Sequence, residues 1–187
     1  EALDLLISEA KKRGIGIILD GVFNHTGDDS VYFNRYGNYP DTGAYQSEKS
    51  PYYNWYTFRH FPDDYECWWN IKILPRVRCD EPSYREFICG DGGVLEKWMR
   101  KGVRGFRLDV ADELSDGFIA DIHSAVREER EDGAIIINGD IPDYTEITAG
   151  LKPQVITFGL SDSCTFHPAD ITFDEKACAS FTAMKGQ

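Results

Sequence analysis

Apolar residues follow two different spacings in the first part of the chain. From residue 3 to residue 10 they recur at the three- and four-residue intervals of a helix face, whereas the run from 15 to 19 is almost continuously apolar. Such a run is typical of a strand buried on both faces of a parallel sheet, and Gly14 between the two segments suits the end of a helix. The pattern therefore predicts a helix, a short turn and a buried strand. The apolar helix positions are Leu3, Leu6, Ile7 and Ala10.

The same order of elements returns after residue 92. An apolar stripe at helical spacing ends at Gly102 and leads into an apolar strand at 103–108. A further helix begins near Ser115, a residue type that caps helices, and another apolar strand follows at 134–137. Alternating helices and buried strands predict the α/β class with a parallel sheet. The helical stripe positions are Val94, Leu95, Trp98 and Met99, then Phe118, Ile122, Ala125 and Val126.

Polar residues follow two of these strands at the point where each strand ends. Asp20, Asn24 and His25 come after the first strand, and Arg107 and Asp109 close the second. Strand alternation places Arg107 and Asp109 on one face of the sheet. A guanidinium at that position keeps the carboxylate ionised and oriented, which is the state a nucleophilic aspartate needs. Two plainer interpretations stay open, an ordinary ion pair at a strand end and a structural histidine at His25.

Together the two motifs resemble the α-amylase superfamily, glycoside hydrolase family thirteen. Asp20-x-x-x-Asn24-His25 looks like the first signature region of that family, and Gly105-Phe-Arg107-Leu-Asp109 looks like the second. The glutamate at position 113, four residues after Asp109, resembles the cyclomaltodextrinase and neopullulanase branch of the family at that position. The resemblance covers about residues 1–130 and includes the segments 30–36, 63–65 and 68–69.

The resemblance implies a partial (β/α)8 barrel, of which this chain contains the third and fourth strand units. Residues 1–27 would be the barrel unit with the first motif, and residues 28–92 a loop-rich inserted subdomain that forms one wall of a sugar cleft. Residues 93–130 would be the unit with the nucleophile motif, followed by a short α/β or β-rich tail of different origin at 131–187. We expect most aromatic side chains of the insertion to form its small core.

The resemblance also implies roles for individual residues. Asp109 would attack the anomeric carbon of an α-glucosidic bond in malto-oligosaccharides, cyclodextrins or pullulan, by a retaining mechanism, with Arg107 holding it. We expect no cofactor. Asn24 corresponds to a position that can bind calcium in some members of the family, but its single carbonyl oxygen does not supply the oxygen ligands that calcium requires, so we expect no metal site. The residues expected to contact substrate are Asp20, Asn24, His25, Trp68, Trp69 and Glu113.

The third signature of the family does not appear where it is expected. After the strand at 134–137 a glutamate would serve as general acid, whereas this chain has Asn138-Gly139-Asp140. Asp140 is one methylene shorter, and the two carboxyls of a retaining site lie only about 5–5.5 Å apart. We therefore expect this chain to be inactive, because the general acid and the remaining barrel strands are missing.

The tail resembles the central domain of Mur ligases, in the segments 135–140, 154–159 and 169–175. The Gly-rich phosphate loop with its lysine and the magnesium carboxylates of those enzymes do not occur. An abrupt change of pattern near residues 128–134 indicates that two coding sequences meet there, either naturally or through sequence assembly. The alternative interpretation of the tail is a divergent β-rich continuation of the barrel.

The charge balance narrows the range of partners. Among 187 residues the net charge is −12, which argues against nucleic acid and anionic membranes as partners and is compatible with a neutral α-glucan or malto-oligosaccharide. Five cysteines without metal-ligand spacing favour a reduced, cytoplasmic setting, although residue 1 is not Met and a signal peptide could precede it. Two other functions stay open: a non-catalytic glucan-binding module and a Mur-like nucleotide-binding fragment.

Overall fold

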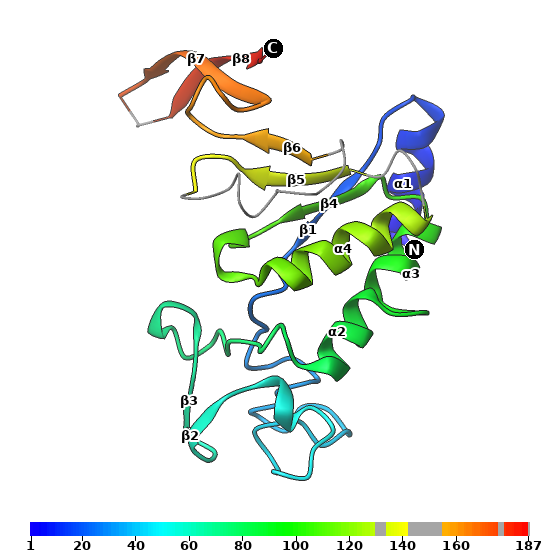
Figure 1. The fold of residues 1–187 in the computed structure, drawn as a ribbon, viewed down its shortest axis with the longest axis vertical. Helices are drawn as coiled ribbons and strands as arrows, with labels where there is room; N and C mark the ends of the chain where they lie inside the picture. Colours follow the sequence, from blue (N-terminus) through cyan, green and yellow to red (C-terminus); the bar gives the residue numbers. More distant parts are fainter. Residues whose placement is uncertain (130–133, 142–154, 176–177, 187) are drawn as a thin grey trace.

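The computed structural model describes residues 1–129, 134–141, 155–175 and 178–186. Six strands of these segments form one sheet in the order β1-β4-β5-β6-β7-β8 (Figure 1). The first four pair in parallel and in chain order, and the last two form an antiparallel hairpin. The predicted α/β class is therefore confirmed. The strands are β1 (Ile18–Gly21), β4 (Gly105–Leu108), β5 (Ala134–Asn138), β6 (Val155–Phe158), β7 (Phe166–Phe173) and β8 (Ala179–Lys185).

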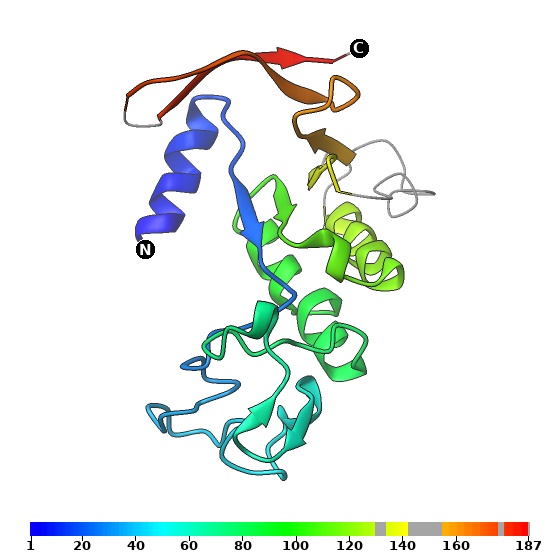
Figure 2. The ribbon, with the colours of Figure 1, turned by 90° about the vertical axis from the view of Figure 1, so that its left-hand side faces the viewer.

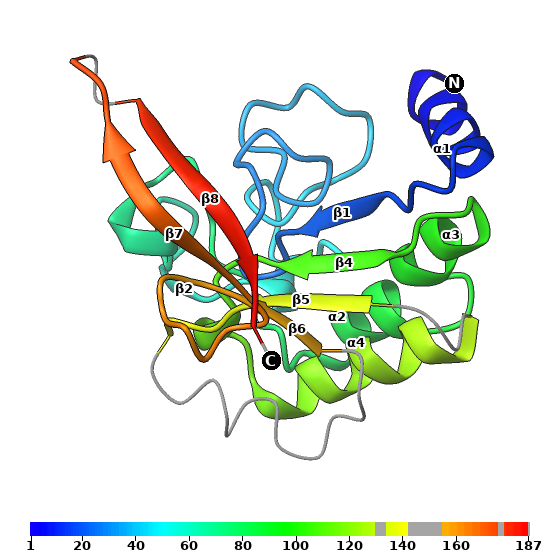
Figure 3. The same ribbon diagram turned by 90° about the horizontal axis from the view of Figure 1, so that it is seen from above.

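Helices cover one face of the parallel strands and leave the other for polar residues. Figure 3 shows α4 (Asp116–Glu129) along one face of β4 and β5, with α2 (Pro82–Cys89) and α3 (Val94–Arg100) beside it. Phe106 and Leu108 are buried, and the ring of Phe106 packs near Phe23, which also contacts Phe118 of α4. Because side chains alternate along a strand, Arg107 lies on the opposite face.

The first helix, α1 (Ala2–Lys12), ends as its sequence predicts. Gly14 has a φ of +71° and donates its N–H to the carbonyl of Lys11, while Ile15 donates to Ala10, both at 3.0 Å. This pair of bonds is a Schellman motif, in which glycine adopts the left-handed conformation without strain. The predicted apolar face is only partly buried, since Ile7 is covered but Leu6 is 54% exposed.

Two strands begin later than predicted. β1 starts at Ile18 and β4 at Gly105, whereas the apolar runs begin at Ile15 and Val103. Both early residues still donate their backbone N–H to the preceding helix, Ile15 to Ala10 and Val103 to Trp98. The apolar runs therefore include the last turn of each helix connection as well as the strand.

Between β1 and α2 the chain forms a lobe of loops and short elements at one end of the sheet (Figure 2). These elements are η1 (Tyr53–Trp55), β2 (Phe58–His60), β3 (Asp64–Tyr65) and η2 (Trp68–Asn70). The expected aromatic core is confirmed: Phe33 and Tyr65 are almost fully buried, with ring centroids 4.8 Å apart.

Helix α2 lies within residues 28–92, which were predicted to be loop-rich, and this prediction is wrong for its last part. Its beginning carries a clear signal, because Pro82 occupies the first turn and the carboxylate of Glu81 accepts the Tyr84 N–H at 3.0 Å. The predicted cap of α4 is confirmed, since Ser115 Oγ accepts the N–H of Phe118 at 3.3 Å. Among the described residues, no helix has the length and apolar character needed to cross a membrane.

Candidate active site

Arg107 lies between two aspartates at the carboxyl ends of neighbouring strands. Asp20 of β1 is its direct partner in the parallel register, and Arg107 Nη1 lies 2.7 Å from Asp20 Oδ1. The same nitrogen lies 2.8 Å from Asp109 Oδ1. The hydrogen bond to Asp20, together with the charge of Asp109, raises the pKa of the guanidinium, which therefore stays charged. The predicted ion pair on one face of the strand is confirmed and includes a third member.

The backbone around Asp109 is held on both sides. Its N–H donates to the carbonyl of Gly21 at 3.2 Å, which ties it to the end of β1. The next residue, Val110, has a φ of +50°, and a left-handed conformation is uncommon for a β-branched residue. Such conformations persist where the surrounding structure imposes them, often at functional sites. Val110 leads directly into η3 (Ala111–Glu113), so the turn also brings Glu113 back toward the site.

His25 faces this cluster from the segment after β1. Its ring stacks on Trp68, with centroids 5.2 Å apart, and its Nδ1 lies 3.3 Å from Asn24 Oδ1. Burial lowers the pKa of His25 from 6.5, and the charges of Asp109 and Glu113 oppose that shift without cancelling it. The imidazole is therefore neutral at neutral pH.

Glu113 binds two donors with one oxygen. Its Oε2 accepts a hydrogen bond from Asn24 Nδ2 at 3.2 Å and lies 3.4 Å from Arg76 Nη2. Asn24 is only 1% exposed. Arg76 was not among the predicted site residues, and no local motif marks it. Its place is set by an antiparallel bridge between Arg76 and His25, which joins the returning end of the insertion to β1.

The two tryptophans predicted to contact substrate differ in what they present. The ring of Trp68 stacks on both His25 and Trp69, and its centroid lies 4.9 Å from that of Trp69. Neighbouring rings therefore already contact the aromatic surface of Trp68. Trp69 is 76% exposed and has a φ of +49°. The outer ring surface that faces solvent at this stack is therefore that of Trp69.

The carboxylate of Asp140 binds backbone N–H groups of the loop after β6. Its Oδ2 accepts the N–H of Leu160, and its Oδ1 accepts the N–H of Ser161 at 3.0 Å. Its own N–H donates to Asn138 Oδ1 at 2.9 Å. Both carboxylate oxygens are thus engaged by backbone donors. Residues 142–144, the rest of the segment where the third signature was expected, lie outside the described residues.

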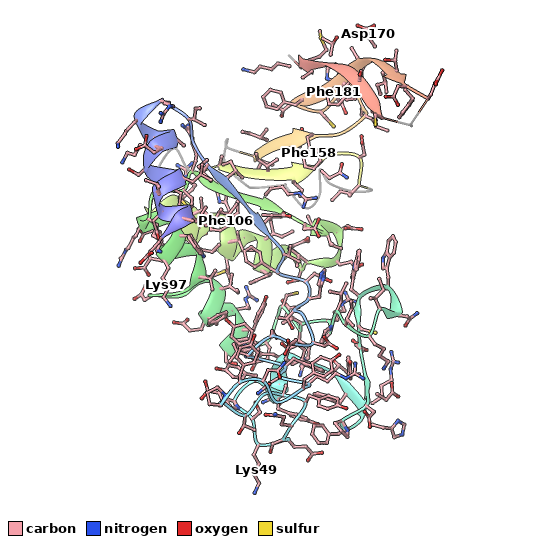
Figure 4. All side chains as sticks on the ribbon, turned by 180° about the vertical axis from the view of Figure 1, so that it is seen from behind. Lys49, Lys97, Phe106, Phe158, Asp170 and Phe181 are labelled. Carbon is pink, nitrogen blue, oxygen red and sulfur yellow. The ribbon has the colours of Figure 1, made fainter. Side chains whose placement is uncertain are left out.

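Phe158 completes this face of the sheet on the side of β6. The guanidinium carbon of Arg107 lies 5.9 Å from the centre of the Phe158 ring, within the range of a cation–π contact. Figure 4 shows Phe158 on β6, beside the hairpin that carries Phe181. Within the described segments no three side chains of metal-binding type come together as a ligand group.

The family with the description alpha amylase, catalytic domain, matches residues 1–178. The chain belongs to the α-amylase family. Amylopullulanase from Thermoanaerobacterium saccharolyticum is 40% identical over 150 residues, which are 70% of this chain and 12% of that protein. Neopullulanase 2 from Thermoactinomyces vulgaris is 32% identical over 138 residues, covering 70% of this chain and 22% of that protein. The chain therefore spans less than a quarter of the length of these two relatives.

Solved structures agree with this assignment. The debranching enzyme from Nostoc punctiforme, in its acarbose-soaked form, superposes with a TM-score of 0.64 at 27% identity, over 83% of this chain and 33% of that one. Together with the parallel order of β1, β4, β5 and β6, this likeness confirms the predicted partial (β/α)8 fold.

A second similarity is to a Mur ligase, the class of enzyme that the predicted tail resembles. UDP-N-acetylmuramate–L-alanine ligase from Agathobacter rectalis is 46% identical over 84 residues, which are 42% of this chain and 18% of that protein. The α-amylase match also extends into the tail, to residue 178, beyond the limit near 130 that the motifs predicted. In the structure β5 pairs with β4 in parallel, so the first strand of the predicted tail continues the sheet of the preceding part. Residues 130–133, most of the predicted junction, lie outside the described part of the chain.

Proposed function

We propose that Asp109 is the nucleophile of a retaining site for α-glucosidic bonds, with malto-oligosaccharides, cyclodextrins or pullulan as substrates. The observation that supports this most directly is the pair of contacts from Arg107 Nη1 to Asp20 and Asp109. Because Arg107 binds Oδ1 of Asp109, the other carboxylate oxygen, Oδ2, is the one that would attack the sugar. A bond forms between Oδ2 and the anomeric carbon while the bond from that carbon to the glycosidic oxygen breaks, and the leaving oxygen takes up a proton. A water molecule later attacks the anomeric carbon, which breaks the bond to Oδ2, releases the sugar and regenerates the carboxylate.

Neighbouring residues would position the sugar rather than react with it. The neutral His25 can exchange a hydrogen bond with a sugar hydroxyl without adding charge to the site. Asp20 holds Arg107 from the other strand and so fixes the direction of the guanidinium. Trp69 offers an exposed aromatic face against which a pyranose ring can stack.

We further propose that this chain protonates the leaving oxygen poorly. Asp140 accepts two backbone N–H groups, and Glu113 is engaged by Asn24 and Arg76. General acid assistance is typically worth about 10²–10⁴-fold in rate. We therefore keep the expectation that the chain is inactive on natural glucans, and we limit the proposed reaction to the formation of a glycosyl-enzyme from substrates whose leaving group needs no proton.

A comparison of two substrates tests this function. Fluoride leaves without protonation, so α-glucosyl fluoride should be consumed, whereas maltotriose should yield almost no glucose under the same conditions. Asp109→Asn should abolish fluoride release, and Asp112→Asn, a matched change in η3, should retain it. Equal turnover of the two substrates would contradict the proposal that the chain lacks a working general acid. Fluoride release that persists in Asp109→Asn would contradict the assignment of Asp109 as the nucleophile.

Glucan binding without turnover is the second candidate, and the exposure of Trp69 favours it. Affinity electrophoresis in pullulan separates it from the first. Retardation of both the wild type and Asp109→Asn, with no fluoride release by either, would establish a binding module. The similarity to the ligase supports a third candidate, nucleotide binding by the tail, for which a shift of the melting temperature with ATP is the corresponding test.

A further inference from the structure

Three segments that are distant in the sequence meet at one oxygen of Glu113. Asn24 belongs to the segment after β1, Arg76 to the returning end of the insertion, and Glu113 to η3 after β4. The distances to Glu113 Oε2 are 3.2 Å from Asn24 Nδ2 and 3.4 Å from Arg76 Nη2. The side chain of Arg76 is 43% exposed and that of Glu113 25%, while Asn24 is buried, so the ion pair is partly sheltered on the side of Asn24.

Backbone bonds fix Arg76 beside the first motif. Val77 donates its N–H to the carbonyl of Asn24 at 2.8 Å, and Thr26 donates to the carbonyl of Pro75 at 3.0 Å. The Arg76 segment therefore runs antiparallel to residues 24–26 like a short strand pair. The guanidinium reaches Glu113 from this fixed backbone.

The contact continues from Glu113 to His25. Asn24 donates to Glu113 through Nδ2 and offers its Oδ1 to His25 Nδ1, so one amide joins the carboxylate to the imidazole. His25 also stands in the field of two carboxylates, Asp109 and Glu113, and Arg76 neutralises the second of them. The ring is otherwise held by its stack on Trp68.

We propose that Arg76 is a positioning residue, which holds Glu113 against Asn24 and, through the Asn24 amide, fixes the orientation of the His25 ring. The reason for positioning His25 rests on the proposed function, whereas the experiment below does not require the chain to be active. Arg76 touches neither of the two aspartates bound to Arg107 among the contacts described above. It acts through Glu113, and its effect must therefore disappear when Glu113 loses its charge.

Titration of His25 by NMR in the whole chain tests the proposal without any need for turnover. Arg76→Gln leaves the Glu113 carboxylate without its counter-charge and free to move away from Asn24, so the pKa of His25 should rise from its lowered value. Arg76→Lys keeps the charge and should keep the pKa of His25 lowered. Arg78→Gln removes the same charge two residues away, from a side chain that bonds the Asn54 carbonyl, and should leave His25 unchanged.

A double variant shows whether the effect passes through Glu113. Glu113→Gln alone should lower the pKa of His25 further, and adding Arg76→Gln to it should change the titration very little. Equal shifts in Arg76→Gln and Arg78→Gln, or no shift in a folded Arg76→Gln, would overturn the proposal. If Arg76→Gln does not fold, a raised pKa of His25 in Arg76→Lys would overturn it instead. Loss of fluoride release with the predicted titration would count against the proposed function alone.

Discussion

One nitrogen of Arg107 binds both Asp20 and Asp109, at 2.7 Å and 2.8 Å from their Oδ1 atoms. The two aspartates follow neighbouring parallel strands, and Asp20 is the register partner of Arg107. A single cation thus fixes two carboxylates at the carboxyl edge of the sheet, where barrel enzymes place their reactive groups. This arrangement gives Asp109 a defined orientation before any substrate binds.

Replacement of Arg107 by lysine tests that orientation. A lysine is a flexible point charge and cannot reproduce the planar guanidinium between two strands. We expect Arg107→Lys to reduce fluoride release from α-glucosyl fluoride by roughly tenfold or more, since small displacements of a reacting group cost up to about 10²-fold. Arg100→Lys, on the exposed side of α3, is the control and should react at the wild-type rate. A fully active Arg107→Lys would show that the bridge is not needed.

The lowered pKa of His25 predicts a pH dependence of stability. Because the unfolded chain binds a proton at His25 more tightly than the folded chain does, this contribution is present above about pH 6.5. It is lost as the pH falls from there through the folded pKa. Urea unfolding at a series of pH values should show this decline, and His25→Gln should reduce it. His60→Gln, at a side chain that is 89% exposed, should leave the decline unchanged.

Trp69 should matter for sugar binding and not for stability. Its ring is 76% exposed, so Trp69→Ala removes little packing and should change the free energy of unfolding by less than about 0.5 kcal/mol. We expect the same variant to weaken retardation in pullulan gels. Phe173→Ala, a comparable truncation at a side chain that is 70% exposed on the hairpin, should migrate like the wild type. Unchanged retardation of Trp69→Ala would remove this ring from the binding surface.

The core between α4 and the sheet should carry much of the stability. Phe118 is fully buried, with its ring 6.3 Å from Phe23 and 6.0 Å from Tyr84. Truncation of such a residue typically costs about 3–5 kcal/mol, so Phe118→Ala should unfold at a much lower urea concentration. Leu5→Ala, at a position that is 64% exposed on α1, should be close to neutral. Similar midpoints for the two variants would contradict this packing.

Local patterns were sufficient to predict several parts of the structure. The common face of Arg107 and Asp109 follows from strand alternation, and the ends of α1 and α4 follow from Gly14 and Ser115. Each of these depends on residues that are close in the sequence. The signal for α2, Glu81 followed by Pro82, was equally local but lay within a segment dominated by turn residues.

Contacts across the insertion could not be predicted in the same way. Arg76 reaches Glu113 only because the insertion returns beside β1, and no residue pattern near position 76 reports that path. The engagement of Asp140 likewise depends on where the loop after β6 runs, since its partners are the N–H groups of Leu160 and Ser161. The resemblance of two short motifs indicated the candidate site residues, whereas the groups that contact them could be found only from the fold.

The most direct test of the central claim is chemical trapping at Asp109. The purified chain is incubated with 5-fluoro-α-glucosyl fluoride, whose fluoride leaves without a general acid and whose glycosyl-enzyme breaks down slowly, and is then digested and analysed by mass spectrometry. We expect one added glycosyl unit on the peptide that contains Asp109, with none in Asp109→Asn. A labelled peptide elsewhere in the chain, or no label on a chain shown to be folded, would contradict the assignment of Asp109 as the nucleophile.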